Sequence, residues 1–121
     1  MAAECELRLV GSISGIEAED LFHFLSDING TPTKRIDTIQ VQATADTAEA
    51  LNLGNISTPM MVLVYAVEND VDVDLTYDTT FNAELSISEG EFNIFKPKGT
   101  VYIKNATASE TATVEIIACG T

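Results

Sequence analysis

Hydrophobic and polar residues alternate along much of this chain with the period of two that is typical of β-strands. The segment DVDVDLTYD, residues 70–78, places apolar residues at odd-numbered positions and aspartate or threonine at even-numbered ones. A half-buried strand has this pattern, because successive side chains point to opposite faces of a sheet. We therefore expect a strand over residues 70–78, with its aspartates on a solvated face.

Several more short segments in the second half of the chain predict strands. Residues 60–67, MMVLVYAV, are apolar on both faces, as in a central strand. Further strands are predicted at residues 81–88 (with Phe81, Ala83, Leu85 and Ile87 inward), 91–95 (with Phe92 and Ile94 on one face), 100–104 and 111–119. Glu89-Gly90 and Pro97-Lys98-Gly99 supply turns between them. Short strands at this spacing favour a sandwich or barrel.

The first half of the chain leaves more alternatives. Residues 4–14 predict an opening strand, and Ile36, Ile39 and Val41 mark another. Residues 15–28 fit either a helix that starts at a capping box, Ser14 to Glu17, or a strand over residues 22–28 that ends at the turn pair Asn29-Gly30. We favour the strand, because the rest of the chain is so uniformly β. Residues 47–54 fit one helical turn ending at Gly54 or an extended loop.

These patterns together predict an all-β fold. We expect residues 1–121 to form a single antiparallel β-sandwich of about eight strands, with a jelly roll as one such arrangement. A chain of 121 residues is long enough to bury a core without covalent cross-links. Residues 1–6 are expected to form a flexible or partner-contacting arm, since chain termini are free to reach a neighbour.

The charge of the chain limits its partners. Six Lys and Arg residues face nineteen Asp and Glu, which gives a net charge of −13. Such a surface repels phosphate backbones and anionic membranes, so we expect neither nucleic acid nor membrane as a partner. Solubility is the ordinary reason for this charge; a basic partner, divalent cations or a salty environment are the alternatives. Four of the six basic residues lie in two predicted loops, 30–35 and 96–99. The candidate partner contacts are Glu4, Thr33, Lys34, Arg35, Lys96 and Lys98.

The residues that enzymes use are scarce. The single histidine, His23, lies between Phe22 and Phe24, where a structural role is the expectation. No nucleophile elbow, phosphate-binding glycine loop or HExxH motif occurs. We expect no enzyme, no catalytic residue and no cofactor.

Asp70, Asp72 and Asp74 are the only candidate metal ligands. Residues two apart on a strand lie about 6.5–7 Å from one another, which is too wide for one ion to bind successive carboxylates tightly. A calcium loop also needs a bend, and no glycine follows here as it does in D-x-D-x-D-G. A solvated strand face is the expected role, and a docking face for a basic partner or a calcium-dependent module are the alternatives.

Two cysteines, Cys5 and Cys119, lie near opposite ends of the chain. The N-terminus lacks the pattern of a secretion signal, so we expect folding in a cytoplasm, where buried reduced thiols are favoured. If the terminal strands pair, the two residues could also form a disulfide bond.

Residues 35–119 resemble small virion proteins of tailed bacteriophages. The resemblance lies in EALNLGNISTP (residues 49–59), the following strand MMVLVYAVEND, the turn and apolar pair SEGEFNIF (88–95), and IKNATASETATVEII near the end. The chain differs at Met60-Met61, where glycine and an aromatic residue are expected, and at Glu68-Asn69.

The resemblance implies a β-sandwich that packs against the major capsid protein or other virion proteins and has no catalytic residue. Capsid decoration proteins of this kind are commonly trimers over junctions between capsomers. We therefore expect a capsid decoration or cement protein, made in the host cytoplasm and located in the virion, as a homotrimer or another homo-oligomer. A carbohydrate- or host-surface-binding adhesion module of a tail or head fibre is the alternative.

Overall fold

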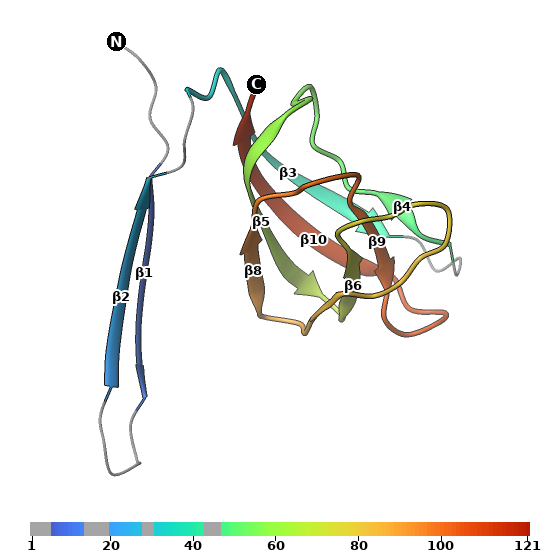
Figure 1. Ribbon diagram of the computed structural model, residues 1–121. Coiled ribbons are helices and arrows are strands. Elements are labelled where there is room, and N and C mark those ends of the chain that lie inside the picture. Colours follow the sequence, from blue (N-terminus) through green and yellow to red (C-terminus); the bar gives the residue numbers. More distant parts are fainter. Residues whose placement is uncertain (1–5, 14–19, 28–30, 43–46) are drawn as a thin grey trace.

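The computed structural model describes residues 6–13, 20–27, 31–42 and 47–121, with side chains from residue 31 onward. From residue 31 the chain forms a sandwich of two packed four-stranded antiparallel sheets, shown in Figure 1. This confirms the predicted all-β class and the single antiparallel sandwich of about eight strands.

The two sheets differ in strand length. The long sheet has the order β3 (Lys34–Gln42), β10 (Ala112–Gly120), β5 (Pro59–Glu68), β8 (Phe92–Phe95). The short sheet has the order β4 (Glu49–Ala50), β9 (Tyr102–Asn105), β6 (Val71–Asp74), β7 (Leu85–Ile87).

The strands pair as though one long hairpin had been rolled up. β3 pairs with β10, β4 with β9, β5 with β8 and β6 with β7, so the second half of the sandwich runs back along the first. Two further pairings, β10 with β5 and β6 with β9, join the two strand pairs of each sheet. Each sheet therefore contains strands from both halves of the chain.

The core lies between the two sheets. Val62, Val64 and Ile116 of the long sheet are fully buried against Val73 and Ile103 of the short sheet. Burial of an aliphatic side chain of this size stabilises the fold by roughly 1.5–3 kcal/mol. Further buried residues, contributed by the connecting segments, are Leu51, Ile56 and Val101.

The strand predicted over residues 70–78 is shorter than expected, and one of its aspartates is not solvated. β6 ends at Asp74, whose side chain is only 1 % exposed. Its carboxylate accepts hydrogen bonds from the backbone N–H of Thr76 (2.9 Å) and of Asn82 (2.9 Å). These bonds turn the chain out of the sheet. Beyond the turn, the ring of Tyr77 stacks on that of Tyr102, with 3.6 Å between the ring centroids.

The strand predicted over residues 81–88 is also shortened. Only Leu85–Ile87 forms β7, and Ala83, which was expected to point inward, is exposed. The carboxylate of Glu84 accepts a bond from the hydroxyl of Thr76 (2.6 Å), and its backbone N–H donates to the carbonyl of Val73 (2.8 Å), so both side-chain and backbone bonds hold this loop.

The segment of residues 47–54 takes the extended alternative rather than the helical one. β4 (Glu49–Ala50) joins the edge of the short sheet, and the backbone N–H of Leu51 donates to the carbonyl of Val101 (2.9 Å). Gly54 follows with φ +60°, a left-handed conformation that glycine adopts without strain.

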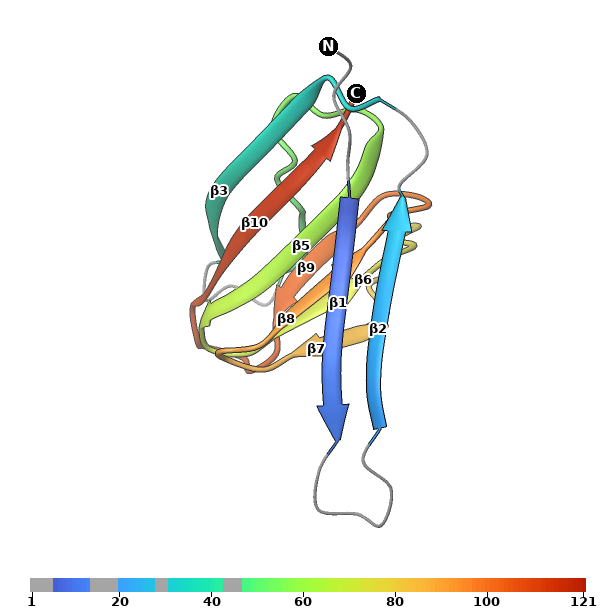
Figure 2. The same cartoon turned by 90° about the vertical axis from the view of Figure 1, so that its left-hand side faces the viewer.

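The N-terminal part of the chain forms a separate hairpin. β1 (Glu6–Ile13) pairs antiparallel with β2 (Asp20–Asp27), and neither strand is hydrogen-bonded into the long or the short sheet. The strand alternative is therefore confirmed for residues 20–27, whereas residues 14–19 and 28–30 lie outside the described residues. The hairpin stands beside the sandwich in Figure 1, and the quarter turn of Figure 2 places it in front of the long sheet.

Candidate interaction surfaces

The long sheet is apolar on its outer face as well as on its inner face. Its strand register defines four rows of residues across the outer face. They are Val41–Thr113–Glu68, Ile39–Glu115–Tyr65–Phe92, Asp37–Ile117–Leu63–Ile94 and Arg35–Cys119–Met61. Antiparallel sheets commonly have one packed face and one solvated polar face, and this sheet departs from that rule.

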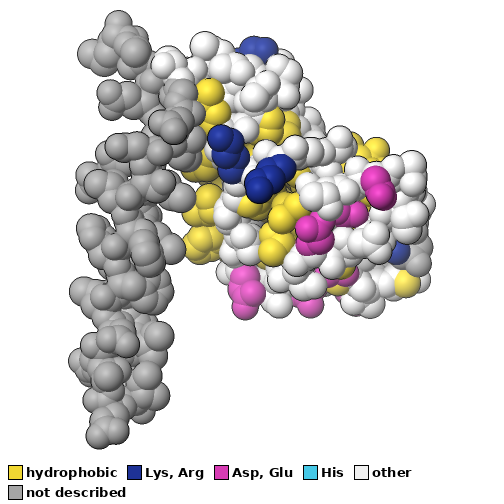
Figure 3. Space-filling view, in the orientation of Figure 1, with side chains coloured by type: hydrophobic (Ala, Val, Ile, Leu, Met, Phe, Trp, Pro, Cys, Tyr) yellow, Lys and Arg dark blue, Asp and Glu magenta, His cyan; other side chains and the backbone are white. Residues whose placement is uncertain are grey.

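Several of the outer residues are largely accessible to solvent. Ile39 is 53 % exposed, Val41 55 % and Phe92 56 %. Met61, Leu63 and Tyr65 of β5 are half-buried, so this strand is fully buried on its inner face only. Its predicted central position is confirmed, because β10 and β8 lie on either side of it. Figure 3 shows hydrophobic side chains along the edge of the sandwich beside the grey atoms and also across the middle of this view, with acidic side chains toward its lower and right-hand parts.

The charges on this face are few and mixed in sign. Within the four rows only Arg35, Asp37, Glu68 and Glu115 are charged, although the whole chain carries −13. The outer face of the long sheet is therefore a place where a second protein can approach without meeting most of the chain's negative charge.

The hairpin has one strongly apolar face. Residues directly opposite one another in an antiparallel pair share a face, and the register pairs Leu9 with Phe24 and Gly11 with Phe22. By alternation, Leu7 and Ile13 lie on that same face of the ribbon. The other face holds Glu6, Arg8, Val10, Ser12, Leu21, His23, Leu25 and Asp27. His23 lies opposite Val10 on this second face.

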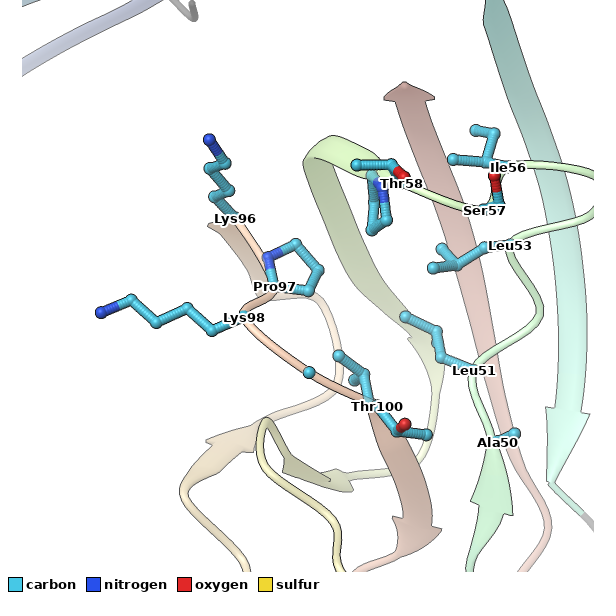
Figure 4. A pocket seen from close by; sticks show the side chains of 13 residues that line it. Ala50, Leu51, Leu53, Ile56, Ser57, Thr58, Lys96, Pro97, Lys98 and Thr100 are labelled. Carbon is cyan, nitrogen blue, oxygen red and sulfur yellow. The ribbon is translucent and has the colours of Figure 1, made fainter. Parts of the chain in front are cut away.

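A groove opens at one end of the sandwich. It has a volume of about 460 Å³ and lies between the β8–β9 connection and the segment that leads into β5. Leu51, Leu53 and Ile56 lie on one side of it and Pro97 on the other (Figure 4). The side chains of Lys96 and Lys98 extend away from this apolar lining in the same view.

The predicted contact residues fall at two separate places. Lys34 and Arg35 belong to the start of β3 rather than to a loop, and the Nζ of Lys34 donates to the carbonyl of Asn55 (2.8 Å). Thr33 precedes them and is exposed, with its backbone N–H bonded to Gly120. Lys96 and Lys98 are exposed at the groove. Glu4 lies outside the described residues.

The candidate metal ligands each make their own hydrogen bonds. Asp70 accepts from the backbone N–H of Glu89 (2.8 Å) and Asp72 from the hydroxyl of Ser86 (2.7 Å), while Asp74 closes its turn. In the part of the chain that the structure describes, no three histidine, cysteine or acidic side chains come together in an arrangement that could hold a metal ion.

Among the acids whose side chains the structure describes, Asp74 is the one with a clearly altered pKa. The backbone N–H of Asn82 is the main cause that holds the pKa of Asp74 below its ordinary value, and that of Thr76 acts in the same direction. Burial opposes this effect, because desolvation disfavours the charged form. Asp74 is therefore ionised at neutral pH and serves as a structural acceptor.

Cys119 lies half-buried on β10, in the outer row between Arg35 and Met61. Cys5 lies outside the described residues, so the possible pairing of the two cysteines stays a prediction. The terminal strands β1 and β10 are not neighbours in any sheet.

The outer apolar face is the feature that was missed from the sequence. The signal was available in MMVLVYAV and in the pair Phe92 and Ile94, which do share a face as predicted. What the pattern did not indicate is that this shared face points away from the core.

Within the described residues no helix is long and apolar enough to span a membrane. No protein-family model, curated protein or solved structure matches this chain.

Proposed function

We propose that this chain is a structural accessory protein of a bacteriophage virion, a capsid decoration or cement protein that stabilises the head through protein–protein contacts. The observation that carries the proposal is the apolar outer face of the long sheet. The sandwich already has a core between its sheets, so this second face is not needed to hold the two sheets together. Exposed apolar patches of this kind in soluble proteins mark interaction surfaces.

The architecture supports the same proposal. The pairings β3–β10, β4–β9, β5–β8 and β6–β7, which follow a hairpin rolled into a sandwich, support the jelly-roll arrangement that we propose. Jelly rolls are used by viral capsid proteins and by lectins, and this part of the argument is an analogy between folds. The resemblance of residues 35–119 to phage virion proteins is consistent with the first of these uses.

The mechanism would be burial of apolar surface across subunit boundaries. Ile39, Val41 and Phe92 supply accessible apolar area on the outer face, and burial of such area contributes roughly 25 cal/mol per Å². Acidic residues at the other sheet, such as Asp72 and Glu84, then remain in solvent and keep the assembled particle soluble.

The groove favours a second candidate function, a carbohydrate- or host-surface-binding adhesion module. Its volume of about 460 Å³ lies in the range of small-molecule sites, roughly 300–1,000 Å³. This candidate places the contact at Leu53, Pro97 and their neighbours rather than on the long sheet.

The test is binding of the purified protein to capsids that lack it. Stoichiometric binding is expected, and it should be lost in Phe92→Lys but kept in Ala83→Lys, which adds the same charge at an exposed site away from the long sheet. Failure of the wild-type protein to bind capsids would contradict the proposal. Glycan binding that is lost in Leu53→Lys would favour the adhesion module instead.

A further inference from the structure

We infer that the outer face of the long sheet is covered by the β1–β2 hairpin of a second copy of this chain. The inference rests on the proposed function, in that it names the partner of the same apolar face. It makes the decoration protein a homo-oligomer whose subunits exchange N-terminal arms.

The hairpin requires a covering partner. A two-stranded ribbon that joins no larger sheet is at best marginally stable in water, and three strands or a packed apolar face are normally needed. β1 and β2 are bonded only to one another. Their register nevertheless places five large apolar residues on one face of the ribbon, together with Gly11, Asp20 and Ser26; they are Leu7, Leu9, Ile13, Phe22 and Phe24.

The sheet requires a covering partner too. With the chain's own hairpin in place, Ile39, Val41 and Phe92 are still more than half exposed. A single chain therefore presents two apolar faces, one on the hairpin and one on the long sheet, and leaves the sheet face largely in water. Figure 2 shows the hairpin on the same side of the sandwich as this sheet face.

The connection allows such an exchange. Residues 28–33 separate β2 from β3, and six residues can span at most roughly 20 Å. This is about the length of one strand of the sheet, which is enough to bring the hairpin alongside a neighbour while β3 stays in its own sandwich.

The charges favour a second copy over an oppositely charged partner. An acidic chain associates with itself best where its own acids are few, and the charged residues in the rows across the outer face are three acids, Asp37, Glu68 and Glu115, and one base, Arg35. A basic partner would instead be drawn to the acidic positions of the short sheet and its loops, such as Asp72 and Glu84.

The experiment measures the mass of the full-length protein in solution by size-exclusion chromatography with light scattering. The wild-type protein is expected to be an oligomer. Phe24→Lys on the hairpin face and Ile39→Lys on the sheet face are each expected to weaken association by about 30-fold or more, and to give monomers. Ala83→Lys, the charge-matched control, should keep the wild-type mass.

Mixing the two defective variants tests the exchange directly. Each retains one intact surface, namely the hairpin of Ile39→Lys and the sheet of Phe24→Lys. An equal mixture should therefore form heterodimers joined by one intact contact. Circular dichroism melts show whether each variant is folded, and an unfolded Phe24→Lys would be replaced by Phe24→Ser.

The outcomes separate the inference from the proposed function. A monomeric wild-type protein, or an oligomer that survives in folded Phe24→Lys or Phe24→Ser, would overturn the hairpin exchange. Monomers that still bind capsids would leave the decoration function intact. An oligomer with the expected variant pattern that ignores capsids would support the exchange and contradict the decoration function.

Discussion

Replacement of Gly120 by alanine should destabilise the sandwich strongly, because the end of β10 leaves no room for a side chain. A Cβ atom at this position would overlap the carbonyl oxygen of Thr58 and lie 2.8 Å from Cγ2 of Ile56. The same oxygen accepts the backbone N–H of Thr121 (3.0 Å), while the carbonyl of Thr121 accepts from Ser57 and Thr58 (both 2.9 Å). The added methyl group therefore disturbs these three hydrogen bonds, which hold the C-terminus against the segment before β5.

The magnitude follows from two terms. Overpacking in a close contact costs about 1–3 kcal/mol, and each of these hydrogen bonds that is lost adds roughly 1 kcal/mol. A total of about 2–4 kcal/mol corresponds to a drop in Tm on the order of 10–20 °C for a domain of this size. The comparison is Gly99→Ala, where a Cβ atom meets nothing within 4 Å.

Thermal melts followed by circular dichroism, with urea titrations of both variants, measure these values. The expected result is a large loss for Gly120→Ala and a change within about 0.5 kcal/mol for Gly99→Ala. If Gly120→Ala melted within a few degrees of the wild-type protein, roughly the effect of an ordinary surface change, the close approach of β10 to Thr58 would be refuted.

Three other changes probe different parts of the sandwich. Ile116→Ala removes a fully buried side chain between the sheets and should cost about 2–5 kcal/mol in urea unfolding; a loss under about 1 kcal/mol would place Ile116 outside the core. Gly90→Ala forces alanine to φ +85° in an open turn and should cost on the order of 1 kcal/mol relative to Gly99→Ala, through backbone strain alone. Because the pKa of Asp74 is lowered in the folded protein, its contribution is present at neutral pH and is lost as the pH falls below the ordinary carboxyl value of 3.8. Asp74→Asn should therefore lower Tm at pH 7 and reduce the loss of Tm between pH 5 and pH 2, and equal pH profiles for the two proteins would contradict this role.

The strands were predictable because side-chain alternation is a direct consequence of strand geometry. Residues 112–120 alternate between inner and outer positions in the structure as their sequence indicates. Residues 34–42 alternate too, but Ile39 and Val41 face outward while Gln42 is buried, which hydrophobicity alone would not predict. Strand ends were less predictable. At Asp74 the alternation continues in the sequence, but the carboxylate captures two backbone N–H groups and ends the strand. The tendency of aspartate to bond the N–H two residues ahead was the available signal, and it competes directly with the period of two.

The candidate surface was harder to predict than the fold. Alternation shows which residues share one face of a strand, but it does not show whether that face points to the core or to solvent. Phe92 and Ile94 share a face in the sequence pattern, but only the pairing of β8 with β5 shows that this face is the outer one. β5 itself is apolar on both faces, so its sequence is consistent with burial on either side. The inner apolar face of the long sheet is buried against the short sheet of the same chain. The outer apolar face is not buried in this way. The sequence therefore specifies more apolar surface than one copy of the sandwich buries, and it is this excess, rather than any reactive group, on which the proposal of assembly rests.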